Sequence, residues 1–167
     1  LWIAPGRQVP QLLKGGGQEK GRRSGTENIY GIAGFGAAAK SASNWQDHAK
    51  LWPKWRSNFV SKLQQACPDI VLTTKDAPCV DNTVSLLLPA VSAQIAVMSL
   101  DMDGFAISSG AACSSGKVQE SHVIRAMGFG PLSSHVIRIS FGWENSQDDI
   151  SALADALIAI YKRHQKK

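Results

Sequence analysis

The sequence predicts an α/β fold in which helices pack against a small sheet. Short apolar runs bounded by turn residues alternate along the chain with longer segments of helical periodicity. Neither a fixed repeat nor a low-complexity linker divides the 167 residues. A hydrophobic content of 44% is enough for a core. This length and composition fit one domain, or one domain with part of another.

The first third of the chain is expected to contain two helices. Residues 2–4 look like the end of a strand, and Gly15–Gly17 form a flexible turn. A close-packed, alanine-rich helix begins near Asn28, with Thr26 or Asn28 in position to cap it. A second amphipathic helix, which carries tryptophans, spans 51–63.

Strands and helices alternate after residue 68. A strand is predicted for each of four short apolar runs, at 69–72, 83–88, 105–108 and 135–141. Short helices are expected at 92–100 and 121–127. The last helix begins with a capping box made by Ser146 and Asp149. Its apolar residues share one face and are Ile150, Leu153, Ala154, Leu157, Ile158 and Tyr161.

Composition excludes several classes of protein. The net charge is +5, but no aromatic residues interleave with the basic clusters, so a nucleic-acid surface is not predicted. No apolar run approaches the roughly 20 residues of a membrane span, and the N-terminal segment lacks signal-peptide features, which favours the cytoplasm. The three cysteines suit neither a disulfide framework nor a zinc site, and the four histidines lack ligand spacing. No metal is therefore predicted.

Cys113 is the first candidate functional residue. It lies in the run Ser108–Gly116, in which all the remaining residues are Ser, Gly or Ala. Such small side chains bury little apolar area, so we expect a mobile surface loop that carries a nucleophilic thiol. The alternative is a Gly/Ser-rich turn that contains a cysteine by chance. Cys67 and Cys79 are interpreted as structural.

Arg138 is the second candidate. It interrupts the apolar run Val136–Phe141, where a permanent charge is costly unless it binds an anion. The planar guanidinium suits a carboxylate, which it can bind through two parallel hydrogen bonds. The alternative is a position on the solvent face of a strand with one buried side.

A third candidate site follows Gly15–Gly17, where Arg22, Arg23 and Thr26 precede the predicted helix. Backbone N–H groups, a hydroxyl and the positive end of a helix dipole together suit a phosphate. The spacing is not that of a P-loop, and the alternative is a solvated turn before a capped helix.

These three segments, in this order, resemble the C-terminal part of cysteine desulfurases of the NifS/IscS type. The matching motifs are GGGQEKGRRSGTEN, SSGAACSSGK and VIRISFG. The resemblance covers nearly the whole chain and implies a fold-type I, pyridoxal-phosphate-dependent enzyme of the class V aminotransferase group, usually a homodimer. It assigns residues 1–46 to the tail of the large cofactor-binding domain and the connecting helix. It assigns 47–167 to the small domain, a mostly antiparallel sheet with helices on one side.

The resemblance also implies roles for three residues. Cys113 matches the nucleophile that takes sulfur from L-cysteine and leaves L-alanine and a Cys113 persulfide. Arg138 matches the arginine that binds the substrate α-carboxylate, and Thr26 matches the residue that reaches the cofactor phosphate of the partner subunit. The expected partners are L-cysteine and a sulfur-acceptor or scaffold protein of iron–sulfur cluster assembly or thiolation.

One departure concerns the Schiff-base lysine. In the family it lies in a Ser-x-His-Lys motif ahead of the segment that matches Leu1, and no lysine here has that context. The chain is therefore expected to be part of a longer protein and to be inactive alone. Two alternatives stay open. One is a selenocysteine lyase or another class V aminotransferase-like enzyme, and the other is a stand-alone persulfide carrier or interaction module that uses Cys113 without a cofactor.

Overall fold

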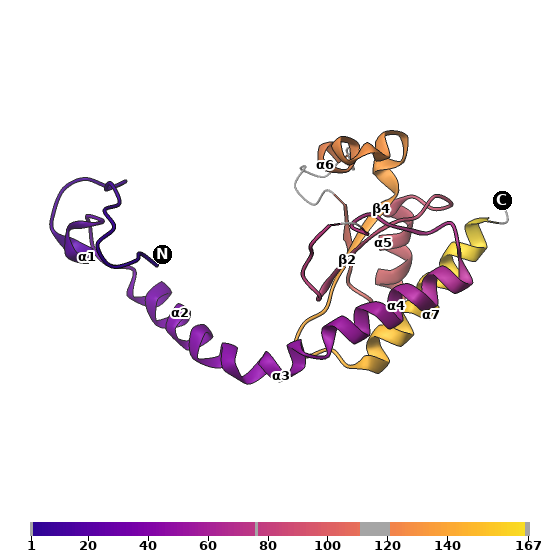
Figure 1. Cartoon of the computed structure of the whole chain (residues 1–167), viewed down its shortest axis with the longest axis horizontal. Helices are drawn as coiled ribbons and strands as arrows, with labels where there is room; N and C mark the ends of the chain where they lie inside the picture. Colours follow the sequence, from indigo (N-terminus) through magenta and orange to yellow (C-terminus); the bar gives the residue numbers. More distant parts are fainter. Residues whose placement is uncertain (1, 76, 111–120, 166–167) are drawn as a thin grey trace. The chain divides into compact units, whose positions relative to one another are not determined.

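The computed structural model describes residues 2–75, 77–110 and 121–165 (Figure 1). The chain divides into two units, Leu1–Asn44 and Trp45–Lys167, and each is described by itself. Assignment of 1–46 and 47–167 to two domains of a larger enzyme stays a prediction. No helix in the described part of the chain is both long enough and apolar enough to cross a membrane.

The first unit opens with irregular backbone. Residues 2–4 form no strand, so that prediction was wrong, because no described segment pairs with them to supply ladder hydrogen bonds. The Gly-rich turn leads into α1 (Gln18–Gly21), a single turn in which Glu19 and Lys20 have left-handed backbone, with φ of 52° and 57°.

The predicted alanine-rich helix is present as α2 (Ile29–Ser41). The Asn28 side chain accepts a hydrogen bond of 3.0 Å from the Gly31 N–H, so Asn28 caps the helix and Thr26 does not. None of the residues of α2 is buried within this chain, although Tyr30 and Phe35 are large and apolar.

The second unit contains a four-stranded sheet of order β1-β2-β4-β3, in which every pair is antiparallel. The strands are β1 (Val71–Leu72), β2 (Thr83–Leu87), β3 (Ser108–Ser109) and β4 (Val136–Ser140). The helices are α3 (Gln46–Ala49), α4 (Trp52–Ala66), α5 (Ala93–Met102), α6 (His122–Ile124) and α7 (Gln147–Gln165). Two short 3₁₀-helices and one π-helix are also present. The 3₁₀-helices are η1 (Ala42–Trp45), at the junction of the two units, and η3 (Gly130–His135), and the π-helix is η2 (Arg125–Phe129).

These elements confirm the predicted α/β class with a small antiparallel sheet, but the edge strands are shorter than expected. The predicted strand at 105–108 is reduced to Ser108–Ser109, because the Phe105 N–H bonds to the Leu100 carbonyl at the end of α5. The strand at 69–72 is reduced to Val71–Leu72, because the Ile70 N–H closes a turn onto Cys67. Local turns therefore take donors that a longer ladder would need.

One face of the sheet carries the main core. Val84 and Leu86 of β2 and Ile137 and Ile139 of β4 are buried against α4, α5 and α7. Helices α4 and α7 lie side by side in this layer (Figure 1). Hence the two-residue period of the central strands separates a buried face from an open one.

The capping box predicted for the last helix is confirmed. The Asp149 N–H bonds to the Ser146 hydroxyl at 3.2 Å, and the Ser146 N–H bonds to the Asp149 carboxylate at 2.8 Å. Hydrogen bonding from the Ser146 backbone N–H to the carboxylate is the main cause that lowers the pKa of the Asp149 carboxyl. Farther along α7, Ile160 is buried, whereas Ile158 is only partly buried, so the apolar face is turned slightly from the prediction.

A half-buried hydrogen bond joins the end of α7 to the segment before β1. Tyr161 is fully buried, and its hydroxyl donates a hydrogen bond of 2.5 Å to the Asp69 carboxylate. Desolvation and this carboxylate raise the pKa of the Tyr161 phenol, which therefore stays protonated as a donor.

Among the described residues, the opposite face of the sheet is covered only at one end. There Leu87 and Val136 pack with Ile124 of α6, and Phe129 and Leu132 close this second, smaller cluster. The segment 122–135 thus covers part of the face that the family resemblance predicted to be free of helices. This segment is α-helical only as far as Ile124. It then continues as the wider π-helix η2, in which Gly128 has left-handed backbone.

Gly110 allows β3 to approach β4 closely. Its N–H donates a hydrogen bond of 2.7 Å to the Val136 carbonyl. A Cβ at position 110 would lie 3.0 Å from that carbonyl oxygen and 3.2 Å from the Val136 Cβ. Only glycine fits this position without displacement of β4.

We expect Leu157→Ala to lower the free energy of unfolding by about 2–5 kcal/mol, because Leu157 is fully buried between α7 and the sheet. Urea denaturation of the chain measures the change. Ala152→Ser, at an exposed position of the same helix, serves as the control and should change stability little. Equal effects of the two substitutions would contradict the assigned core.

We expect Gly110→Ala to destabilise the protein by about 1–3 kcal/mol through the contact with Val136. Amide hydrogen exchange at Ser108 and Arg138 should become faster, since these residues form the hydrogen-bonded pair of β3 and β4, the two strands that the added methyl group pushes apart. Gly130→Ala is the matched control, because a Cβ there meets no atom within 4 Å. Unchanged exchange in Gly110→Ala would refute the close approach.

Candidate functional site

A polar strip lies on the open face of the sheet. It consists of the residues of β2, β3 and β4 that point away from the main core and are not covered by the smaller cluster. They are Thr83, Ser85, Ser108, Arg138 and Ser140. All five are exposed or half-buried, whereas the residues between them on β2 and β4 are buried. The alternation of the strands therefore gathers four hydroxyls around one guanidinium.

Arg138 is exposed in this strip, and its guanidinium has no hydrogen bond or ion pair with any described residue. Lys50 and Lys62, by contrast, pair with nearby aspartates at 2.6 and 2.7 Å. The position matches the solvent-face alternative, because Arg138 is not buried. It is also compatible with the hypothesis that Arg138 binds a carboxylate, because the paired N–H donors of its guanidinium are free to bind an external anion.

Cys113 lies outside the described residues, which stop at Gly110 and resume at Ser121. Both flanks are anchored. Gly110 bonds to Val136 at one flank, and at the other the Ser121 hydroxyl accepts a bond of 3.3 Å from the Ile124 N–H. Cys113 follows Gly110 by three residues in the sequence, and the Gly110 N–H bonds to β4, the strand that carries Arg138.

The other two cysteines differ from each other. Cys67 is fully buried, and burial raises the pKa of its thiol, as expected for a structural and unreactive cysteine. Cys79 is exposed and takes no part in the core, so the structural interpretation was wrong for this residue.

Thr26 lies at the end of a braced turn in the first unit. The Arg23 guanidinium donates hydrogen bonds to the carbonyls of Gly25 and Thr26, at 3.2 and 2.7 Å. The Ser24 hydroxyl donates to the Gly16 carbonyl at 2.9 Å, which ties the turn to the Gly-rich segment. The Thr26 side chain is exposed, and its hydroxyl bonds to no other described residue. The turn therefore holds the Arg23 cation on two backbone carbonyls and leaves the hydroxyl of Thr26 available as a donor, and both groups suit an anion.

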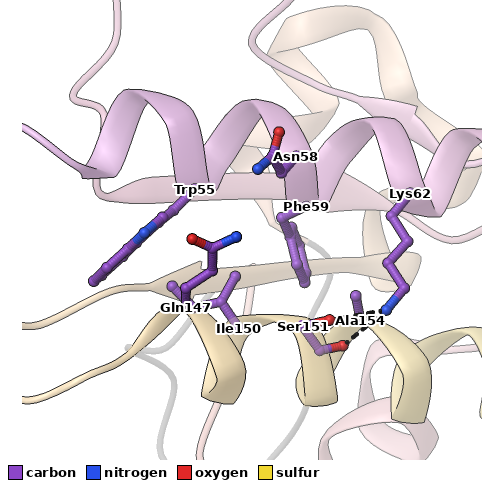
Figure 2. Close-up of a pocket in the computed structure, with 8 residues that line it drawn as sticks. All are labelled: Trp55, Asn58, Phe59, Lys62, Gln147, Ile150, Ser151 and Ala154. Atoms are coloured by element: carbon purple, nitrogen blue, oxygen red, sulfur yellow. Dashed lines mark hydrogen bonds between the residues drawn. The ribbon is translucent and has the colours of Figure 1, made fainter.

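Two hollows occur in the second unit. One, of about 230 Å³, lies between α4 and α7, and Trp55 and Phe59 extend from α4 into its lining (Figure 2). At its mouth Lys62 donates to the Ser151 hydroxyl at 3.0 Å and pairs with Asp155, so its charge is already compensated. The other, of about 420 Å³, includes Ser140 of the polar strip among its lining residues. Arg138 lines neither hollow.

The described residues contain no group of three or more His, Cys, Asp or Glu side chains that could hold a metal ion. Sequence reasoning identified Arg138 but missed Ser85 and Ser108, which are its neighbours on the two adjacent strands. The alternation of Thr83 and Ser85 with Val84 and Leu86 carried the signal, since it marks a strand with one polar face.

Comparison with known proteins gives consistent matches. The chain is 32% identical to a protein named cysteine desulfurase IscS 1 from Archaeoglobus fulgidus, over 98% of this chain and 43% of that protein. It is 34% identical to a putative cysteine desulfurase IscS 1 from Bacillus subtilis and to a cysteine desulfurase from Klebsiella pneumoniae. These two matches also cover 98% of this chain, and 44% and 41% of the relatives.

Solved structures agree with these matches. The X-ray structure of a NifS-like protein from Rickettsia africae matches with a TM-score of 0.75 and 33% identity, over 93% of this chain and 41% of that one. The chain thus spans less than half the length of the relatives it matches. The family model described as aminotransferase class V matches residues 8–153. The chain therefore belongs to the aminotransferase class V family.

Proposed function

We propose that this chain is the C-terminal part of a pyridoxal-phosphate-dependent cysteine desulfurase, which converts L-cysteine to L-alanine and keeps the sulfur as a persulfide on Cys113. The observation that carries the proposal is the unpaired guanidinium of Arg138 in a polar strip, beside the strand from which the Cys113 segment begins. The names of the relatives support the same reaction.

Arg138 binds the substrate carboxylate in this proposal. Its guanidinium presents paired N–H donors that match the two carboxylate oxygens, and no described acid competes for them. Fixing the carboxylate at one end of a small amino acid also fixes the direction of its remaining bonds. The role assigned to Arg138 is thus both affinity and orientation.

Cys113 is the proposed nucleophile. Its thiolate attacks the sulfur of the bound cysteine, a sulfur–sulfur bond forms, and the bond between that sulfur and the substrate β-carbon breaks. The electron pair of the broken bond stays with the substrate, which takes up a proton and leaves as L-alanine. The Cys113 persulfide then passes its outer sulfur to an acceptor protein.

The turn at Thr26 fits an anionic phosphate, because the Arg23 guanidinium binds the Thr26 carbonyl, the Thr26 side chain is exposed, and neither side chain meets a carboxylate in the described part of the first unit. We assign Thr26 to the phosphate of pyridoxal phosphate held by the partner subunit of a homodimer. When bound, this cofactor supplies an aldehyde for the substrate amine and a conjugated ring that accepts electrons from the substrate carbons.

The proposal needs more protein than this chain. No lysine here lies in the sequence context of the family's Schiff-base lysine, so the lysine is assigned to the remainder of a longer product. Helix α2 supports this, since Tyr30 and Phe35 are 90% and 74% exposed and a helix apolar on all sides is normally buried. A cytoplasmic location and a sulfur acceptor of iron–sulfur cluster assembly or thiolation complete the proposal.

We expect Cys113→Ala to abolish alanine release from L-cysteine while cofactor absorbance is retained, because only the sulfur acceptor is lost. The assay uses the longest product of the gene that encodes this chain, with pyridoxal phosphate and a thiol reductant. Cys79→Ala removes an exposed thiol outside the proposed site and should keep full activity. Alanine release by Cys113→Ala at the wild-type rate would refute the proposal.

We expect Arg138→Ala to weaken transition-state binding of L-cysteine by about 2–5 kcal/mol, measured as kcat/KM, because a charge-assisted carboxylate contact is lost. Arg138→Lys should retain part of the effect, since it keeps the charge but not the fork. Arg163→Ala, an exposed arginine on α7, controls for the change in net charge. If Arg138→Ala and Arg163→Ala have the same kcat/KM, Arg138 does not bind the carboxylate.

A further inference from the structure

Arg138 is flanked by one serine on each adjacent strand. In the register of the sheet, Ser85 of β2 and Ser108 of β3 are both directly opposite Arg138 of β4. Side chains of directly opposed residues share a face, so the two hydroxyls and the guanidinium form one row across the polar strip. Both serines are half-buried.

Ser85 and Arg138 form the closer of the two kinds of antiparallel residue pair, the non-hydrogen-bonded pair. The Phe141 N–H bonds to the Asn82 carbonyl and the Leu88 N–H to the His135 carbonyl, which fixes where the hydrogen-bonded pairs occur along β2 and β4. Ser85 and Arg138 therefore form a non-hydrogen-bonded pair, with a Cα separation of about 4.5 Å. The preceding pair of this kind already has its hydroxyls in contact, since Thr83 and Ser140 bond at 3.3 Å.

Ser108 and Arg138 form the hydrogen-bonded kind of antiparallel pair, in which the two Cα atoms lie farther apart. Because the Gly110 N–H bonds to the Val136 carbonyl, Ser108 and Arg138 form a hydrogen-bonded pair, with a Cα separation of about 5.5 Å. A long arginine side chain can span either separation. Both serine hydroxyls are therefore within its reach from opposite sides.

The hydroxyl groups of Ser85 and Ser108 can accept hydrogen bonds but carry no charge. Neither hydroxyl bonds to another group in the described residues, and no described carboxylate pairs with Arg138. A hydroxyl oxygen can accept an N–H of the guanidinium and leave its positive charge for an external anion. An acid at either position would form a cross-strand ion pair instead and neutralise that charge.

We infer that Ser85 and Ser108 are positioning residues of the carboxylate site: their hydroxyl oxygens accept hydrogen bonds from the Arg138 guanidinium when it binds the carboxylate of an amino-acid substrate. This inference rests on the proposed function of Arg138. It extends that function by naming what orients the guanidinium and why the strip contains hydroxyls and no acid.

The test compares a double variant, Ser85→Ala with Ser108→Ala, with the wild type in the longest product of the gene. The KM for L-cysteine should rise about tenfold while kcat changes by less than about twofold, because the lost bonds act on binding. The dissociation constant of L-alanine, measured by calorimetry, should rise by the same factor. Ser85→Thr combined with Ser108→Thr keeps both hydroxyls and should restore most of the affinity.

Two controls make the test specific. Ser57→Ala removes an exposed hydroxyl of α4, outside the polar strip, and it should leave KM unchanged. In an Arg138→Ala background the double serine variant should lower kcat/KM no further, because the serines act through Arg138. Ser85→Asp should raise KM more than Thr83→Asp, since only position 85 faces the guanidinium directly.

The outcomes separate this inference from the proposed function. An unchanged KM in the double serine variant, when Arg138→Ala alone raises KM, overturns the inference and leaves the role of Arg138 intact. An equal loss of kcat/KM from the serine substitutions with and without Arg138 also overturns it. An unchanged KM in Arg138→Ala alone overturns the carboxylate role, and the inference with it.

Discussion

The antiparallel pairing of β2 with β4 positions both the core and the candidate site. Its register puts Val84 and Leu86 with Ile137 and Ile139 on one face, where α4, α5 and α7 bury them. The same register places every second residue on the opposite face. A slip of one residue would bury Arg138 and expose the core residues of β4, so hydrophobic burial fixes the position of the guanidinium as firmly as it fixes the fold.

The edge strand β3 connects this sheet to the proposed chemistry. It is only two residues long, and its approach to β4 depends on the absence of a side chain at Gly110. The segment that contains the proposed nucleophile Cys113 follows this glycine directly in the sequence. A rigid anchor followed by small residues suits a thiol that must meet first a substrate and then an acceptor.

The two units depend on the rest of a protein to different degrees. The second unit has its own core, a capped final helix and the hydrogen bond between Tyr161 and Asp69. Helix α2 of the first unit buries none of its residues within the chain. This contrast agrees with the proposal that the chain is part of a longer protein, since the chain spans less than half the length of the relatives it matches.

The sequence by itself determined the α/β class and the capping box of α7, narrowed the cap of α2 to Thr26 or Asn28 and identified Arg138 as a candidate site residue, because these depend on local periodicity and on the chemistry of single residues. Only the tertiary structure decided the lengths of β1 and β3, the cover over Leu87 and Val136, and the placement of Ser85 and Ser108 beside Arg138. These features depend on which strands become neighbours. Residues 85, 108 and 138 are far apart in the chain, so their common row exists only once long-range pairing has set the register.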